Sequence, residues 1–164
     1  MASVQIYSFT NIQGVFAYSP TKSFTFGGSE AKGIVSITIS QANDNTIHDI
    51  SVDGGIFVLP VLVYNGTISI ECQQTSTFHL FLIDWFNNLK TEAKVGTSTG
   101  NASESSFKNW ANAVMLINQT SSSSTSVTRH LITGISPQKV ADIPYQSRGS
   151  NVTWTLMAAN ITYS

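Results

Sequence analysis

The feature that most constrains this chain is the repetition of short runs in which apolar and polar residues alternate. In "TISIEC" and "NVTWTLMAANI", for example, apolar side chains recur at nearly every second position, which is the period of a half-buried β-strand. Turn-forming residues such as Asn, Asp and Gly separate the runs. The pattern predicts strands near residues 5–9, 15–18, 23–26, 34–40, 46–52, 57–64, 67–72, 111–118, 126–133, 138–142 and 151–161.

Two details of this pattern bear on how the strands connect. Asn65-Gly66 stands between "FVLPVLVY" and "TISIEC" and predicts a tight hairpin that joins those two runs. Pro60 cannot donate a backbone hydrogen bond, so its strand is expected to lie at a sheet edge or to carry a bulge.

One segment has a helical period instead. In "TSTFHLFLIDWFNNLK", large apolar residues recur three or four positions apart, and Thr75, Ser76 or Thr77 can provide the N-cap. The segment predicts one flanking helix over about residues 76–90. Its aromatic side chains need a sheet or the end of a barrel to pack against, because no other segment offers comparable apolar area.

Composition indicates a subunit that makes interfaces. The 164 residues suit a single domain, and no change of composition divides them. Only 10% of the residues are charged, whereas about 25% is typical of soluble proteins. Ser, Thr and Asn take their place, and burying hydroxyls and amides costs less than burying ions. A chain that assembles with copies of itself is consistent with this surface.

Charge and cysteine content restrict the partners and the compartment. The net charge of -1 provides no basic field for gripping phosphates, so specific nucleic-acid recognition is disfavoured while passive contact with DNA stays open. The first residues do not resemble a signal peptide, and no apolar run reaches the roughly 20 residues of a membrane-spanning helix. The single cysteine, Cys72, excludes an internal disulfide, so we expect folding in a reducing cytoplasm.

The sharpest candidate for a chemical site lies in "DISVDGGI". Asp49, Asp53 and Gly54 match early positions of a calcium loop, but Pro60 stands where a bidentate Glu is required. The alternative, which the pattern favours, is a turn at residues 53–55 after a strand.

Other motifs do not predict catalysis. His48, His79, His130 and Cys72 stand far apart in the sequence without the short spacing of a zinc site, and each histidine is interpreted as a surface or interface residue. There is no G-x-S-x-G elbow, and "GGSEAKG" lacks the residue order of a phosphate-binding loop. We therefore expect no enzyme, no cofactor and no metal site.

The order of the segments carries a resemblance over nearly the whole chain. The start "MASVQIYSF", the block "GGSEAKGIVSITISQANDNTIHDISVDG", the segment "TISIECQQTSTFHLFLIDWFNNL" and the ending "IPYQSRGSNVTWTLMAANI" together resemble the tail tube (inner tube) proteins of contractile-tailed bacteriophages. The resemblance implies a mainly β fold, a β-barrel or sandwich with one flanking helix. It also implies that six copies form a ring in which the inner strands join neighbouring subunits.

The resemblance further implies a structural virion protein of the phage tail. Stacked rings would form a hollow tube inside a contractile sheath, and DNA would be ejected through its lumen without specific binding. The implied partners are other copies of the chain, the tail sheath protein, the baseplate and tail terminator proteins, and a tape measure protein in the lumen. Tubes of R-type bacteriocins and of type VI secretion are related in architecture.

Candidate residues for the lumen or the ring interface are Asp44, Asp49, Asp53, Ile37 and Ile39. The three carboxylates have no Lys or Arg nearby in sequence and would repel phosphate, which suits a channel that passes DNA. A strand shared between subunits removes an open sheet edge, so a Lys at Gly33 or Ile37 is expected to impair assembly. An ordinary solvated turn remains the alternative for the three Asp residues.

A function of another class also fits the sequence. A ligand-binding β-sandwich, for example a carbohydrate-binding or adhesive module, would use an exposed Trp110 or Trp154 and would stay monomeric. A hydrolase with dispersed Ser, His and Asp is the weakest alternative, because no spacing supports it.

Overall fold

The computed structural model describes residues 11–27, 32–98, 108–120 and 127–164 of the chain. Within these ranges the elements are β1 (Ile12–Ser19), β2 (Lys22–Gly27), β3 (Ile34–Gln41), β4 (Thr46–Ile50), β5 (Ile56–Pro60), β6 (Gly66–Gln73), α1 (Thr77–Ser98), the 3-10 helix η3 (Lys108–Ala111), β7 (Ala113–Thr120), β8 (Val127–Pro137) and β9 (Asn151–Tyr163). The prediction of a mainly β chain with one α-helix is confirmed. The strand predicted at residues 5–9 lies outside the described residues.

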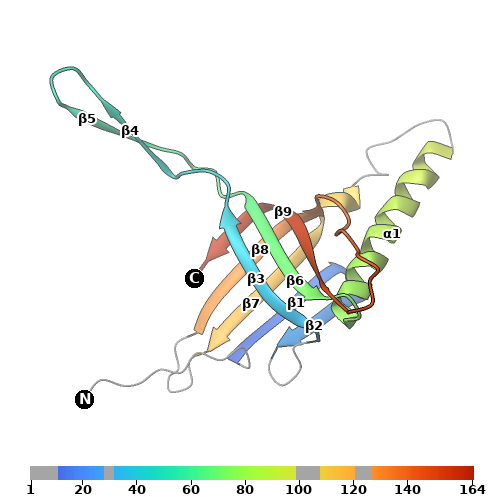
Figure 1. Ribbon diagram of the computed structural model, residues 1–164. Helices are drawn as coiled ribbons and strands as arrows, with labels where there is room; N and C mark the ends of the chain where they lie inside the picture. The colour runs from blue at the N-terminus through green and yellow to red at the C-terminus, as the bar shows by residue number, and fades with distance from the viewer. Residues whose placement is uncertain (1–10, 28–31, 99–107, 121–126) are drawn as a thin grey trace, which may run out of the picture.

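Seven of the strands form one antiparallel sheet in the order β2-β1-β7-β8-β9-β6-β3. The sheet curls into a half-barrel, with β2 and β3 at its two edges (Figure 1). Alternation decides which side chains face the hollow: Ile68 pairs with Leu156 and Ile70 with Trp154, and all four are fully buried. The residues between them point to the outer face of the sheet.

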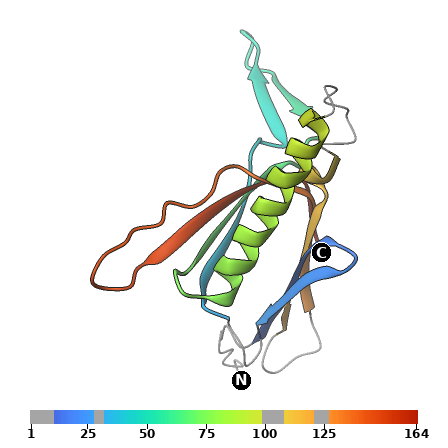
Figure 2. The same ribbon diagram turned by 90° about the vertical axis from the view of Figure 1, so that its right-hand side faces the viewer.

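Helix α1 lies along the hollow of the curled sheet (Figure 2). Ser76 is its N-cap, because the Ser76 hydroxyl accepts a hydrogen bond from the His79 amide at 3.1 Å. Phe78, Leu82 and Trp85 recur on one face of the helix and are fully buried. Phe16 of β1 packs edge-on against Phe78 and Trp85, with ring centroids 6.3 and 5.1 Å apart. This aromatic cluster is the centre of the core.

A buried polar pair joins the helix to the sheet. The Trp154 indole donates a hydrogen bond to His79 Nδ1 at 2.9 Å, and His79 is only 3% exposed. Burial lowers the pKa of His79, because the charged ring would lose its hydration. The prediction that His79 is a surface or interface residue is therefore wrong: its neutral ring serves as the acceptor that a buried indole needs. Cys72 is also fully buried, and burial raises the pKa of its thiol.

The hairpin predicted at Asn65-Gly66 is wrong. β5 pairs with β4, whereas β6 pairs with β3 and β9. Gly66 is needed for close packing, since a Cβ there would lie 2.1 Å from the Ser40 carbonyl oxygen. The run predicted as a strand at 138–142 belongs to the connection between β8 and β9. Pro60, at the end of a strand in a two-stranded sheet, does lie at an edge.

Candidate functional site

Residues 42–65, which we call the arm, leave the sheet between β3 and β6 and project away from it (Figure 1). β4 and β5 form a separate two-stranded sheet in the arm. Its cross-strand pairs are Thr46 with Pro60, Ile47 with Leu59, His48 with Val58, Asp49 with Phe57, and Ile50 with Ile56.

The tip of the arm is a turn built by the residues that suggested a calcium loop. The Ser51 amide donates to the Gly55 carbonyl at 2.8 Å. The Asp53 carboxylate accepts hydrogen bonds from the Ser51 hydroxyl and from the Gly55 amide. The hydroxyl, and after it the amide, hold the pKa of Asp53 below its usual value. Asp53 therefore closes a turn, as the alternative interpretation of this segment held.

The arm exposes apolar side chains on both of its faces. Within β4 and β5, the exposed fractions of the large apolar side chains range from 52% at Ile47 and Leu59 to 71% at Ile50, with Phe57 at 63%. Along each strand, successive side chains alternate between the two faces. An isolated hairpin of this size is marginal in water, and clustered exposed apolar groups mark a surface that another molecule covers.

Side-chain amides hold the base of the arm. Asn43 donates to Asn65 Oδ1 at 2.9 Å, and Asn45 donates to the Val61 carbonyl at 3.1 Å. Gln41 donates to the Asn43 carbonyl and to Asn45 Oδ1. Backbone bonds from Ala42 to Asn65 and from Val61 to Asn45 complete the junction. The arm is thus fastened to the end of β3 by a ladder of neutral hydrogen bonds.

A second surface feature is an apolar groove of about 390 Å³ on the body of the protein. Residues of five strands, β1, β3, β7, β8 and β9, line it: Ile12, Val35, Ser36, Ile37, Ile39, Ile117, Gln119, His130 and Tyr163. Ile37 and Ile39 pair with the buried Ile70 and Ile68, so they face the hollow of the sheet. We call this feature the groove.

His130 is the polar group of interest in the groove. Its ring packs edge-on against Tyr163, with centroids 5.2 Å apart. Its Nδ1 atom is buried and has no hydrogen-bond partner among the described residues. A buried polar atom without a partner is costly. Because the chain itself encloses Nδ1, an incoming group would meet the His130 ring at the part that lines the groove.

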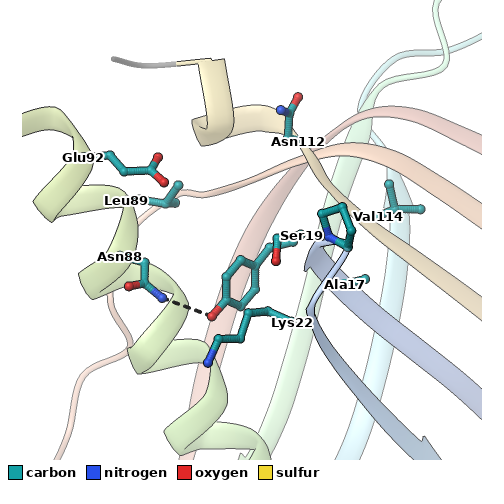
Figure 3. Close-up of a pocket in the computed structure, with 10 residues that line it drawn as sticks. Ala17, Ser19, Lys22, Asn88, Leu89, Glu92, Asn112 and Val114 are labelled. Atoms are coloured by element: carbon teal, nitrogen blue, oxygen red, sulfur yellow. Dashed lines mark hydrogen bonds between the residues drawn. The ribbon is translucent and has the colours of Figure 1, made fainter. Parts of the chain in front are cut away.

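A larger pocket, of about 630 Å³, lies between the β1–β2 turn and α1 (Figure 3). The Tyr18 hydroxyl donates to Asp84 at 3.2 Å and accepts from Asn88 at 3.1 Å. Burial is the main reason why the pKa of Tyr18 is raised. Figure 3 shows Asn88 and Glu92 of α1 facing Ser19 and Lys22 across the pocket. These contacts fasten the β1–β2 turn to the helix.

The five residues predicted for the lumen or ring interface fall into two groups. Asp44, Asp49 and Asp53 lie at the base, middle and tip of the arm. Ile37 and Ile39 lie in the groove.

Gly33, where a Lys was expected to impair assembly, is needed by the fold itself. Its φ is +81°, and a Cβ there would lie 2.2 Å from the Ser76 side chain. A substitution at Gly33 therefore tests folding and does not isolate assembly.

The outer face of β3, β6 and β9 was not singled out by the sequence. Its side chains are mainly hydroxyls, namely Thr38, Ser40, Thr67, Ser69, Thr153 and Thr155, as the pairing register shows. Glu71 of β6 lies on the same face, and its carboxylate accepts a hydrogen bond from Asn151 at 3.0 Å. The face is polar and nearly uncharged. The alternation of Ser and Thr with Ile along these strands is the sequence pattern that could have predicted this polar face.

A metal-binding cluster, an exposed tryptophan platform and a membrane-spanning helix are each absent from the described part of the chain. There, no three His, Cys, Asp or Glu side chains group together in a way that would hold a metal ion. Trp154 is fully buried and Trp110 is half-buried against Phe86. The exposed tryptophan that a carbohydrate-binding module would use is therefore not provided by either residue. No helix in the described ranges has the length and apolar character needed to cross a membrane.

Comparison with known proteins identifies one matching family and several solved structures with a similar fold. The family described as the bacteriophage PhiTE tail tube protein matches residues 4–164. No curated protein sequence matches the chain.

Among solved structures, one from the anti-feeding prophage baseplate, described as 6-fold symmetrised, has a TM-score of 0.59 at 12% identity, covering 100% of this chain and 97% of the other. A sheath/tube terminator of the extracellular contractile injection system PVC has a TM-score of 0.53 at 15% identity, with 99% of each chain covered. The PVC sheath-tube complex has a TM-score of 0.52 at 14% identity, covering 96% of this chain and 90% of the other. These structures share the fold of the chain.

Proposed function

Because this chain belongs to the family of bacteriophage PhiTE tail tube proteins, we propose that it polymerises as stacked hexameric rings into the hollow inner tube of a contractile phage tail. The structural role in the virion tail is that of the family. The finer elements of the proposal are the six-fold ring, the stacking and the passage of DNA. Residues 1–164 act together as one tube domain.

The observation that carries the proposal is the arm. A monomeric protein gains nothing from a hairpin that exposes Ile50, Ile56 and Phe57 to water at 62 to 71% each. Covering that apolar surface stabilises the assembled state by about 25 cal/mol for every Å² removed from water. Copies of the same chain are the obvious cover, because a tube surrounds each subunit with others.

The open sheet edges support ring formation. β2 pairs only with β1, and β3 pairs only with β6, among the described strands. An unpaired edge is a template for another strand. Joining the β2 edge of one copy to the β3 edge of the next would close the strands of all copies into one continuous barrel, with no edge left in the ring.

The outer face of β3, β6 and β9 is the proposed channel wall. Its hydroxyl-rich surface, with Glu71 as a carboxylate already hydrogen-bonded to Asn151, neither attracts nor strongly repels phosphate. DNA held by basic groups would move poorly, since each neutralised phosphate adds to affinity. A neutral wall lets DNA pass without specific binding, and it accommodates a tape measure protein before ejection. In this arrangement the three Asp residues of the arm lie away from the lumen, and Asp49 is the one that we place at a contact between copies.

Further partners follow from the same proposal. The solved structures with this fold come from a sheath-tube complex, a sheath/tube terminator and a baseplate. We place a sheath protein around the tube, and baseplate and terminator proteins at its two ends.

Electron microscopy of the purified chain over a range of concentrations tests the proposal. We expect hollow tubes or six-fold rings, with the β3–β6–β9 face toward the channel in averaged images. The matched variants are Phe57→Ser on the arm and Thr153→Ser on the outer face of β9. The first should raise the concentration needed for polymerisation, whereas the second should leave that concentration unchanged. A folded wild-type chain that stays monomeric at every concentration would contradict the proposal.

A further inference from the structure

We propose that the groove of one copy is the docking site for the arm of a second copy, with Asp49 of the arm meeting His130 of the groove. This inference rests on the proposed function and adds to it a specific contact. It brings together, across two copies, the residues that the single chain keeps apart: Asp49 on the arm and Ile37 and Ile39 in the groove.

The two faces of the arm differ in chemistry. One face carries Ile47, Leu59, Phe57 and Asp49, because these form two adjacent cross-strand pairs whose side chains point the same way. The other carries His48, Val58, Ile50 and Ile56. The first face is therefore an apolar surface with a single carboxylate. All eight side chains are exposed in the single chain.

The groove has the complementary composition. Its walls are chiefly isoleucine and valine, at positions 12, 35, 37, 39 and 117. Its polar side chains include His130, whose buried Nδ1 lacks a partner among the described residues, and Tyr163 beside it. The volume of about 390 Å³ exceeds by an order of magnitude the roughly 30 Å³ that one water occupies, so it accommodates several side chains.

The charges select the face. A carboxylate buried in an apolar groove requires a hydrogen-bond donor, and an imidazole N–H is one. Arg129, the cation nearest to His130 in the sequence, does not compete for this carboxylate. It donates a hydrogen bond to Asn118 at 3.2 Å, and its side chain lies on the opposite face of β8. Asp49 and His130 therefore satisfy each other, while Phe57 and Leu59 replace water along the isoleucines.

The direction of the arm makes the contact intermolecular. The arm points away from the half-barrel (Figure 1), and the amide ladder at its base fixes that direction. Arm and groove are different surfaces, so the contact is head-to-tail. Contacts of that kind generate rings or helical stacks. The second apolar face of the arm then remains for another neighbour.

Cysteine cross-linking tests this contact directly. One chain carries Phe57→Cys, and a second carries Ile37→Cys; the native Cys72 is fully buried and does not compete. We expect the mixed chains to form a disulfide-linked dimer under mild oxidation. The matched controls are Val58→Cys, on the opposite arm face, and Thr153→Cys, on the outer face of β9. Each control pairing should give several-fold less dimer.

A second measurement tests the polar pair. Asp49→Asn should raise the concentration needed for assembly by roughly 10-fold to 100-fold, the usual effect of removing a charge-assisted hydrogen bond. Asp44→Asn, at the base of the arm, should leave it unchanged.

The outcomes separate the two proposals. The docking inference would be overturned, and the tube function left standing, if tubes form but the Phe57→Cys and Ile37→Cys chains do not cross-link. The same holds if the Phe57→Cys chain cross-links equally well to the Thr153→Cys chain. If the unmodified chain does not polymerise at all, both the docking contact and the tube function are contradicted.

Discussion

The curled sheet and the arm are both antiparallel β-structure, yet they treat their apolar residues in opposite ways. In the sheet, Ile68, Ile70 and Trp154 face α1 and are fully buried. In the arm, Ile50, Ile56 and Phe57 are more than 60% exposed. The apolar face of the sheet is thus covered within one chain, whereas the apolar side chains of the arm are left exposed by it. Under the proposed function, the stability of the subunit resides in the sheet and its helix, and the stability of the assembly depends on the arm.

The sharpest test of this comparison places the same substitution in both regions. Phe16→Ala removes a fully buried ring from the aromatic core and should lower the free energy of unfolding by about 3–5 kcal/mol. Phe57→Ala on the arm should change it by less than about 0.5 kcal/mol. Urea denaturation of the monomer measures both. If Phe16→Ala leaves the chain unfolded, Phe16→Leu provides a milder version. Equal losses at the two sites would refute the division of roles.

A smaller effect is expected where the two regions join. A Cβ at Gly66 would lie 2.1 Å from the Ser40 carbonyl oxygen, so Gly66→Ala should cost about 1–3 kcal/mol through overpacking. Gly149, which has nothing within 4 Å of such a Cβ, is the control and should tolerate Ala. The midpoint of urea unfolding measures the loss. A neutral Gly66→Ala would show that the junction is looser than the packing indicates.

The pH dependence of stability should come from the core. The pKa of His79 is lowered in the folded chain, so below the ordinary histidine value of about 6.5 the unfolded chain binds a proton that the folded chain does not. Stability should therefore fall as the pH drops from about 6.5 toward the folded pKa, by at most about 1.4 kcal/mol per pH unit.

His79→Asn is the matched variant for this measurement. Its side-chain oxygen replaces Nδ1 as the acceptor for the Trp154 indole but does not titrate. Urea midpoints of the two chains should converge as the pH is lowered. The same pH slope in both would assign the effect to other groups.

The smallest effect is expected at the base of the arm. Asn45→Ala removes the hydrogen bond to the Val61 carbonyl and the acceptor for Gln41. We expect amide exchange at Ala42 and Val61 to accelerate by up to about tenfold, because a hydrogen bond contributes about 1 kcal/mol. Global stability should change little. Asp44→Ala is the neighbouring control, and unchanged exchange in Asn45→Ala would mean that the backbone alone holds the arm.

The sequence predicted the sheet and helix well, because burial there follows local periodicity. Alternation placed β6 and β9, and the helical spacing of Phe78, Leu82 and Trp85 placed α1. Ser76 is one of the three residues predicted as its cap, and the helix continues to Ser98, past the predicted end near residue 90. The resemblance to tail tube proteins is confirmed by the family match over residues 4–164.

The arm and its contacts were harder to predict. β4 and β5 show the same apolar content as buried strands, and no local rule tells a run covered by its own chain from one covered by another. Asn65-Gly66 was misread as a hairpin turn, because its roles, an acceptor for Asn43 and close packing against Ser40, depend on β3, which lies far away in sequence. The groove joins residues from β1, β3, β7, β8 and β9, so no spacing in the sequence reveals it.

The amide ladder at the base of the arm has a consequence for where the particle can work. Hydrogen bonds between Asn43, Asn45, Asn65 and the backbone involve no titrating group and no ion pair. Dissolved ions do not screen them as they screen charges. A phage released from its host meets water of widely different salinity and acidity. The angle at which each subunit holds its arm is set by groups that do not respond to either.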